Sequence, residues 1–138
     1  MKHSSVNDCT IIELPVVHNV AGNITAINNG DRILPFEVKR VYYLYDIPGG
    51  ESRGAHAHKE LHQLIVAASG SFDITIGDGL TKRTFNLSRP YMGLYLPPGL
   101  WREMDNFSSG SICLVLASEV YKEDDYIRDY DDFKNLKG

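Results

Sequence analysis

The sequence predicts an all-β protein, an antiparallel barrel or sandwich followed by a short C-terminal helix. Three observations support this fold class. Most of the chain consists of short apolar or alternating runs rich in β-branched and aromatic residues, turn residues interrupt these runs, and one segment near the end has helical spacing. The 138 residues are predicted to form one domain, residues 1–138, and 43% hydrophobic and 23% charged residues are ordinary for a folded protein.

The predicted strands follow one another at short intervals through the middle of the chain. They fall at residues 36–46, 61–70, 71–79, 81–88, 91–99 and 111–121, and Gly, Pro, Asp or Asn marks the breaks. The triplet Gly-Asp-Gly at 77–79 separates two of the runs and predicts a hairpin.

The predicted helix lies in residues 121–137. Tyr126, Tyr130 and Phe133 recur at spacings of four and three, which predicts an aromatic stripe that docks the helix on the barrel. The same segment is acidic, and a solvated helix face accounts for its carboxylates without a metal. These carboxylates are Asp124, Asp125, Asp129, Asp131 and Asp132.

Composition argues against several classes of function. A net charge of -4 provides no general basic field for a nucleic acid, so no nucleic-acid partner is expected. No apolar run approaches the length that spans a bilayer, and the predicted location is the cytoplasm. The two cysteines, Cys9 and Cys113, are predicted to be buried thiols and not a disulfide framework.

A histidine cluster is the strongest sign of chemistry. In the stretch RGAHAHKELHQ, residues 53–63, His56 and His58 are two apart, so on a strand both side chains project from one face. A third histidine, His62, shares that face only if the alternation continues unbroken. Two imidazoles in one cavity can bind a metal, transfer protons or pack in the core, and proton transfer is the favoured interpretation because their unperturbed pKa lies near neutrality.

Two motifs in the chain resemble those of the cupins, which are jelly-roll barrels. The first runs through Gly50, His56, His58, Gln63 and Gly70, and the second through Gly93, Pro97, Gly99, Arg102 and Asn106. The resemblance places Gln63 and Arg102 at two of the four usual metal-ligand positions. A neutral amide and a permanent cation disfavour a divalent metal, so no metal and no cofactor are expected. This register also puts His62 on the opposite face, with a turn or bulge near residues 59–60.

A narrower resemblance concerns the substrate. The run Arg53-Gly54-x-His56 is similar to that of metal-free cupins that act on nucleotide-linked keto sugars, and residues 33–134 together resemble the dTDP-4-oxo-6-deoxy-glucose 3,4-ketoisomerases. The resemblance implies conversion of a dTDP-4-keto-6-deoxyhexose to its 3-keto isomer through an enediol or enediolate, without a redox cofactor. The alternatives are a 3,5-epimerase-like enzyme, a non-catalytic sugar-nucleotide-binding cupin and a metal-dependent cupin oxygenase.

The resemblance also implies roles for individual residues. His58 is the first choice for the base at C3 and His56 for its partner at C4, although the order can be reversed. Tyr43, Arg102 or a protonated histidine would donate a hydrogen bond to the developing oxyanion. Arg53 would hold the diphosphate by its bidentate guanidinium.

Other residues are expected to complete the binding site. A ring from the strand that carries Tyr42, Tyr43 and Tyr45, or the ring of Trp101, would stack on the thymine. Gln63 and Arg102 would contribute further contacts to the substrate. Lys39 and Arg40 are candidates to assist with the diphosphate, with a surface ion pair as the simpler interpretation. The resemblance finally implies a homodimer that exchanges an N-terminal strand, residues 9–15, and leaves the C4 configuration of the product open because some relatives carry histidine where this chain has Arg102.

Overall fold

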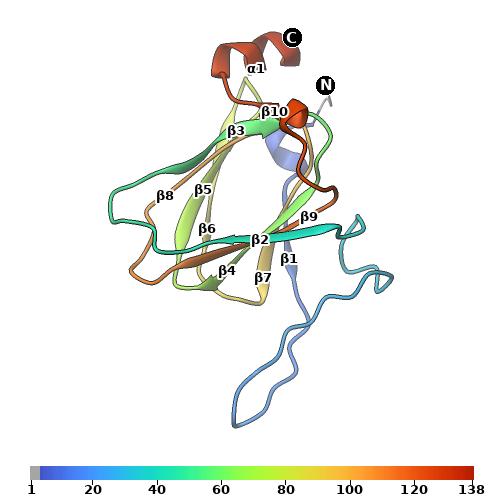
Figure 1. Cartoon of the computed structure of the whole chain (residues 1–138), viewed down its shortest axis with the longest axis vertical. Coiled ribbons are helices and arrows are strands. Elements are labelled where there is room, and N and C mark those ends of the chain that lie inside the picture. The colour runs from blue at the N-terminus through green and yellow to red at the C-terminus, as the bar shows by residue number, and fades with distance from the viewer. Residues whose placement is uncertain (1–3) are drawn as a thin grey trace.

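The computed structural model describes residues 4–138, and these form two antiparallel sheets that face each other (Figure 1). One sheet has the strand order β1-β7-β4-β9-β2 and the other β10-β3-β8-β5-β6. The strands are β1 (Thr10–Glu13), β2 (Arg40–Leu44), β3 (Arg53–His58), β4 (Gln63–Ser69), β5 (Phe72–Gly77), β6 (Lys82–Leu87), β7 (Met92–Leu96), β8 (Trp101–Asp105), β9 (Ile112–Ala117) and β10 (Tyr126–Ile127). The all-β, jelly-roll prediction is therefore confirmed.

The core lies between the inner faces of the two sheets. Ile74 and Ile76 on β5 and Leu94 and Leu96 on β7 are fully buried there, because side chains two apart on a strand share a face. Burying each such side chain stabilises the fold by about 1.5–3 kcal/mol. Cys9 and Cys113 are buried as free thiols, as predicted.

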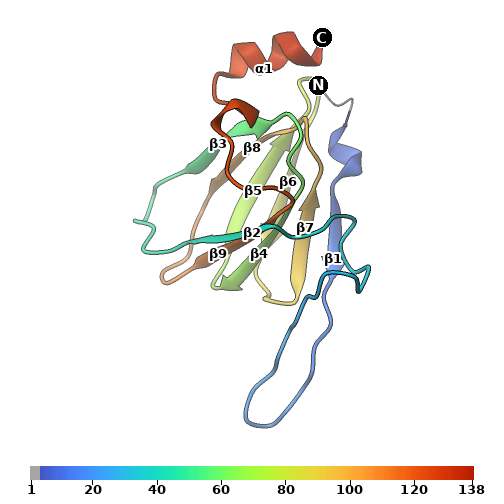
Figure 2. The same ribbon diagram turned by 45° about the vertical axis from the view of Figure 1, so that its right-hand side comes forward.

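Strand β4 is apolar on both faces, and this explains its unbroken run of hydrophobic residues. Ile65 packs in the central core, whereas Leu64 and Val66 face the other side of the sheet. The segment between β1 and β2, residues 14–39, covers that outer face with Leu34 and Phe36. In Figures 1 and 2 the first part of this segment projects beyond the end of the barrel before the chain returns to it.

The predicted hairpin is confirmed between β5 and β6. The Asp78 side chain accepts hydrogen bonds from the backbone N–H groups of Leu80 and Thr81, which closes the turn. It also accepts the backbone N–H of Val6, in the 3₁₀ helix η1 (Val6–Asp8), and thereby ties the N-terminal segment to this turn.

The C-terminal helix is shorter than the sequence predicted. Helix α1 spans Tyr130–Lys137, with Asp129 as its N-cap, and lies across one end of the barrel (Figure 2). Its Tyr130 and Phe133 rings pack against Trp101, so this part of the docking prediction is confirmed. The prediction was wrong for Tyr126, which belongs to β10 after the 3₁₀ helix η2 (Glu123–Asp125), since pairing with β3 replaces helical hydrogen bonds there.

Strand β1 pairs with β7 of the same chain, in the register Thr10↔Tyr95 to Glu13↔Met92. The exchange of this segment with a partner thus stays a prediction. Among the described residues, no helix is long and apolar enough to cross a membrane.

Candidate active site

A cavity of about 490 Å³ opens where the edge strand β2 of one sheet faces β3 of the other. Its walls carry an imidazole, three phenols and three guanidinium groups. They belong to His56, Tyr42, Tyr121, Tyr126, Arg40, Arg53 and Arg128. Positive groups at the opening and a titratable ring on the wall suit a small anionic ligand that undergoes proton transfer.

A β-bulge brings Arg53 and His56 into the same cavity. The two residues are three apart, so uninterrupted alternation on β3 would send them to opposite faces. The β3–β8 register shifts between them, and Gly54 adopts a φ of 79° there. A Cβ on Gly54 would lie 2.9 Å from Met104 Cε, so both the backbone angle and the packing favour glycine. The Arg-Gly-x-His run thus encodes a bend that serves the site.

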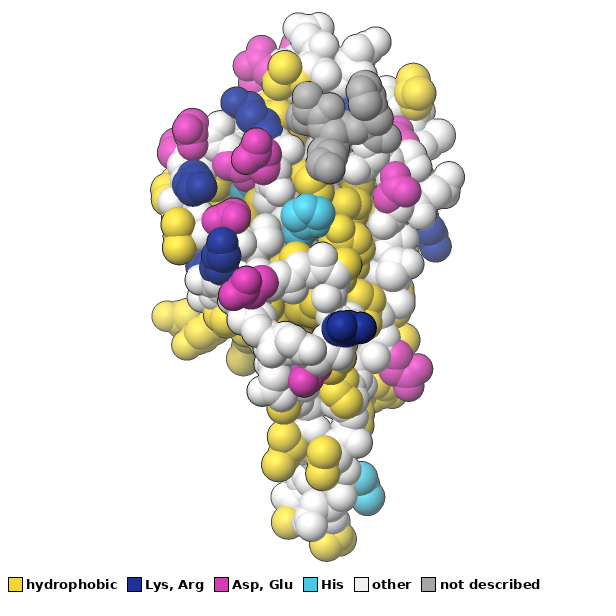
Figure 3. All heavy atoms as spheres, turned by 90° about the vertical axis from the view of Figure 1, so that its right-hand side faces the viewer, with side chains coloured by type: hydrophobic (Ala, Val, Ile, Leu, Met, Phe, Trp, Pro, Cys, Tyr) yellow, Lys and Arg dark blue, Asp and Glu magenta, His cyan; other side chains and the backbone are white. Residues whose placement is uncertain are grey.

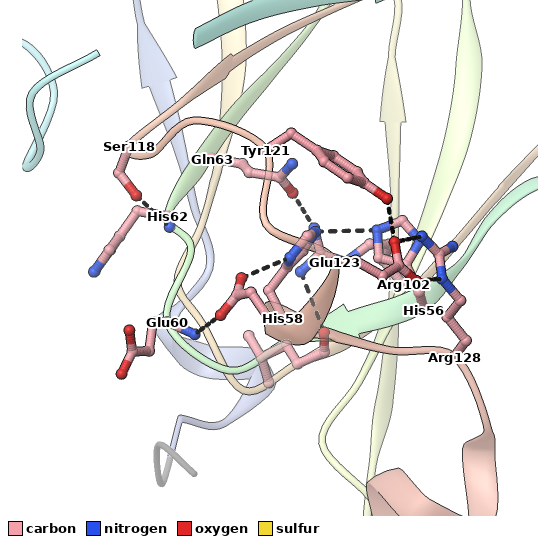
Figure 4. Close-up of polar contacts among 12 residues, drawn as sticks. His56, His58, Glu60, His62, Gln63, Arg102, Ser118, Tyr121, Glu123 and Arg128 are labelled. Carbon is pink, nitrogen blue, oxygen red and sulfur yellow. Dashed lines mark hydrogen bonds and ion pairs between the residues drawn. The ribbon is translucent and has the colours of Figure 1, made fainter. Parts of the chain in front are cut away.

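His56 and His58 project into the interior together, as predicted, and their Nε2 atoms lie 3.2 Å apart (Figure 4). His58 is 0% exposed, and His56 is only partly buried and lines the cavity. The Nδ1 atom of His58 lies 2.9 Å from Asp125 Oδ2. Tyr126 covers both imidazoles, with ring centroids 4.3 Å from His58 and 5.0 Å from His56. His56, His58 and Asp125 therefore form a continuous hydrogen-bonded series that begins at the cavity.

Both imidazoles are neutral in this environment. Burial, together with the charges of Arg102 and Arg128, lowers the pKa of His56 from 6.5 to about 3. Burial followed by the Arg102 charge also lowers the pKa of His58. The contact between His58 and Asp125 has ion-pair distance, but the burial of the ring favours a neutral imidazole that is hydrogen-bonded to the carboxyl group. A neutral histidine has a lone pair and can act as a base.

Arg102 and Gln63 lie behind the cavity wall, and so the prediction that they contact the substrate does not match their placement. Arg102 is 2% exposed and donates to Gln63 Oε1 and to the Leu100 carbonyl. Gln63 in turn donates its amide to the Tyr42 hydroxyl at 3.0 Å. Burial lowers the pKa of Arg102 from 12.5 to about 10, so the guanidinium remains charged near neutral pH. Its charge is a cause of the low pKa of both histidines.

The structure does not bring Tyr43 or Trp101 to the cavity. On β2 the side chains alternate, so Tyr42 points inward and Tyr43 outward, where its ring is 57% exposed beside Tyr45. The Trp101 ring is buried against Tyr130 and Phe133, because helix α1 docks on it. These placements correct the expected roles of Tyr43 as an oxyanion donor and Trp101 as a stacking surface.

The structure places Lys39 and His62 away from the cavity and Arg40 in its wall. Lys39 makes a surface ion pair with Glu119 at 3.5 Å, whereas Arg40 lines the cavity with its guanidinium over the Tyr42 ring. His62 follows a bend at residues 59–60 and its ring stacks on Tyr95. The ring points away from the histidine pair, as the motif register predicted (Figure 4).

The donor set does not fit the divalent metal that cupin barrels commonly hold. Arg102 places a guanidinium, which has no lone pair to donate, beside the amide of Gln63 at two of the four ligand positions. Within residues 4–138, no group of three or more His, Cys, Asp or Glu side chains is arranged to hold a metal ion.

Four residues of the site were missed by the sequence analysis: Tyr121, Asp125, Tyr126 and Arg128. All come from residues 121–137, which were predicted to form a helix with Tyr126 in its docking stripe and Asp125 on its solvated face. Asp125 instead binds His58. Arg128 makes a bidentate pair with Glu123 beside Tyr121 (Figure 4). One signal was available in the sequence, because binding and catalytic residues lie disproportionately in the segments that connect the regular elements of a fold.

A jelly-roll barrel with an inward-facing histidine pair on β3 defines a cupin-type protein. The family model described as FdtA: WxcM-like, C-terminal, matches residues 7–138. The chain belongs to this FdtA family.

Proteins named as 3,4-oxoisomerases or 3,4-ketoisomerases are similar to most of the chain. A TDP-4-oxo-6-deoxy-α-D-glucose-3,4-oxoisomerase of Aneurinibacillus thermoaerophilus is 44% identical over 124 residues, which cover 90% of this chain and 88% of the relative. A 3,4-ketoisomerase from Helicobacter canadensis is 43% identical, with a TM-score of 0.90 and coverage of 94% of this chain and 97% of its own. A mutant 3,4-ketoisomerase from Thermoanaerobacterium thermosaccharolyticum, in complex with TDP-4-keto-6-deoxyglucose, is 36% identical, with a TM-score of 0.92 and coverage of 96% and 95%.

Proposed function

We propose that this protein is a TDP-sugar 3,4-ketoisomerase of deoxysugar biosynthesis, which converts a dTDP-4-keto-6-deoxyhexose to its 3-keto isomer. The observation that carries the proposal is the neutral His56–His58 pair on the wall of an arginine-rich cavity. The family and the activities of its similar members support the substrate class.

His56 is the base in this proposal, and His58 supports it from behind. This order reverses the first expectation, because His56 lines the cavity whereas His58 has no exposed surface. The ketone at C4 acidifies the C3 hydrogen, so His56 takes that proton and leaves an enediolate. After a proton moves from the C3 oxygen to the C4 oxygen, His56 returns a proton to C4 and the C3 ketone forms. A positioned base contributes about 10²- to 10⁴-fold to such a reaction.

Tyr42 is the donor to the developing oxyanion. Its hydroxyl oxygen already accepts a hydrogen bond from Gln63 Nε2, so its own proton is available to a group in the cavity. Burial raises the pKa of Tyr42, which keeps the phenol protonated. The Arg102–Gln63 contact fixes the amide orientation and thereby the direction of the Tyr42 O–H.

The cavity arginines bind the diphosphate. Arg53 and Arg40 line the opening, and guanidinium groups bind phosphate oxygens in a bidentate fork. Arg128 is already bound by Glu123, so we assign the diphosphate to Arg53 and Arg40. The thymine is assigned to the aromatic lining of the same cavity, which includes Tyr121 and Tyr126.

Incubation with dTDP-4-keto-6-deoxyglucose in deuterated water tests the proposal. NMR at early times should show the 3-keto isomer, with enzyme-dependent deuterium at C4 if His56 exchanges its proton with solvent. Deuterium at C5 with inversion would instead indicate a 3,5-epimerase. Ligand binding without any product would indicate a non-catalytic sugar-nucleotide-binding cupin. If the hydrogen that starts at C3 is found quantitatively at C4 of the product, the transfer is not coupled to solvent.

We also propose a homodimer, a single domain over residues 1–138 and a cytoplasmic location. The dimer is supported by the projecting part of residues 14–39, where hydrophobic side chains stand out at the surface (Figure 3). Val16, Val17, Val20 and Ile24 are all exposed there. Covering such a patch is a common reason for association. Sedimentation as a monomer at micromolar concentration would contradict the dimer.

A further inference from the structure

Asp125 has the contacts of a residue that orients the histidine pair. Its Oδ2 lies 2.9 Å from His58 Nδ1, and its Oδ1 accepts the backbone N–H of Glu60 at 2.8 Å. Its side chain is only 15% exposed, although its neighbour Asp124 in the same 3₁₀ helix is exposed. The carboxylate comes from a segment 67 residues from His58 and reaches it because β10 pairs with β3.

The hydrogen bonds of this carboxylate determine the positions of the protons on both imidazoles. A carboxylate only accepts, so His58 must carry its proton on Nδ1. A neutral imidazole has one proton, and the Nε2 of His58 is then an acceptor. Because that atom lies 3.2 Å from His56 Nε2, His56 must donate there. The lone pair of His56 is consequently on Nδ1.

We propose that Asp125 is a positioning residue that fixes these two tautomers and makes Nδ1 of His56 the base of the isomerisation. The inference rests on the proposed function and adds a residue and a nitrogen atom to it. When Nδ1 takes the C3 proton, the C3–H electron pair enters the enediolate and His56 becomes an imidazolium. Its Nε2–H then strengthens the hydrogen bond to His58, and the Asp125 carboxylate stabilises the positive charge across the pair. Return of the Nδ1 proton to C4 restores the resting state.

A second cavity gives the carboxylate contact with solvent. This cavity, of about 340 Å³, is lined by Asp125, Asp124, Lys59 and Lys122, among others. Asp125 and His58 both border this cavity, so this end of the series lies next to solvent, whereas the sugar would enter from the side of His56. Of the three residues His56, His58 and Asp125, only His56 lines the larger cavity, which also contains Arg53.

The test is the variant Asp125→Asn, with Asp124→Asn as a matched control from the same 3₁₀ helix and cavity. In Asp125→Asn the amide oxygen can keep the Glu60 N–H, which turns the amide NH₂ toward His58 Nδ1. That donor forces the proton of His58 onto Nε2, and His56 must then accept at Nε2 and carry its proton on Nδ1. The base would be lost although size and fold are kept.

We expect kcat of Asp125→Asn to fall about 10²- to 10⁴-fold with KM changed less than about threefold, and Asp124→Asn to match the parent protein. Equal kcat in both variants would overturn the inference. ¹⁵N NMR of the imidazoles in the parent protein is a second measurement that needs neither turnover nor a variant. Protonated Nδ1 on His58 and Nε2 on His56 would support the inference, and the opposite tautomers would overturn it. If the protein shows the expected tautomers but no ketoisomerase turnover, the result would contradict the proposed function and leave the inference on Asp125 standing.

Discussion

Replacement of Tyr42 by phenylalanine tests whether the inward tyrosine of β2 is the oxyanion donor. Tyr42→Phe removes one hydroxyl and keeps the ring that Arg40 covers. Loss of a single oxyanion donor costs about 10²- to 10³-fold in kcat, which corresponds to about 2.7–4 kcal/mol of transition-state stabilisation. Because the donor acts mainly on the enediolate, KM should change little.

The same change should destabilise the fold, because the amide of Gln63 donates to the Tyr42 oxygen. A buried donor left without its acceptor costs about 1–3 kcal/mol. At about 4 °C per kcal/mol for a chain of this size, Tm should fall by about 4–12 °C. Thermal unfolding measures this shift, and conversion of dTDP-4-keto-6-deoxyglucose followed by NMR measures kcat.

Tyr43→Phe is the matched control, since its ring is exposed on the other face of the same strand. We expect its kcat and Tm to equal those of the parent protein. A Tyr42→Phe variant that kept more than about a third of the parent kcat would refute the assignment of the donor. An equal loss in Tyr43→Phe would return the role to Tyr43.

Three further predictions concern metal, pH and the diphosphate. Extended treatment with a strong chelator should leave turnover and Tm unchanged, because Gln63 and Arg102 replace two metal ligands; activity restored by a divalent metal would contradict this. The unfolding free energy should decrease as the pH falls below 6.5, because burial lowers the pKa of His56 and the unfolded chain binds protons that the native state does not. Between about pH 7 and pH 4 the unfolding free energy, measured by chemical denaturation, should change by at most about 1.4 kcal/mol per pH unit for each histidine. The same pH dependence in His56→Asn would show that His56 does not cause it. Arg53→Ala should weaken TDP binding in calorimetry by about tenfold or more, whereas Lys39→Ala, at the surface ion pair, should leave it unchanged.

The sequence predicted the parts of the site that depend on local geometry. The spacing of His56 and His58 determines a shared face on any strand, and the motif register separated Gln63 from His62. Alternation alone leaves two equivalent phases for a strand, however. The sequence therefore did not determine whether Tyr42 or Tyr43 points inward. The packing of β2 against the barrel turns Tyr42 inward and Tyr43 outward, opposite to the prediction that Tyr43 is the donor.

The sequence by itself determined the all-β class, the hairpin at 77–79, the histidine pair and the family resemblance, because each depends on residues close together in the chain or on recurring motifs. Only the tertiary structure decided that Asp125 reaches His58, that Arg102 supports Tyr42 through Gln63, and that Trp101 receives helix α1. These contacts join residues that are distant in sequence. Their formation depends on which strand edges pair and which side chains fill the shared core, and these long-range choices minimise the free energy of the whole barrel and not of any one segment.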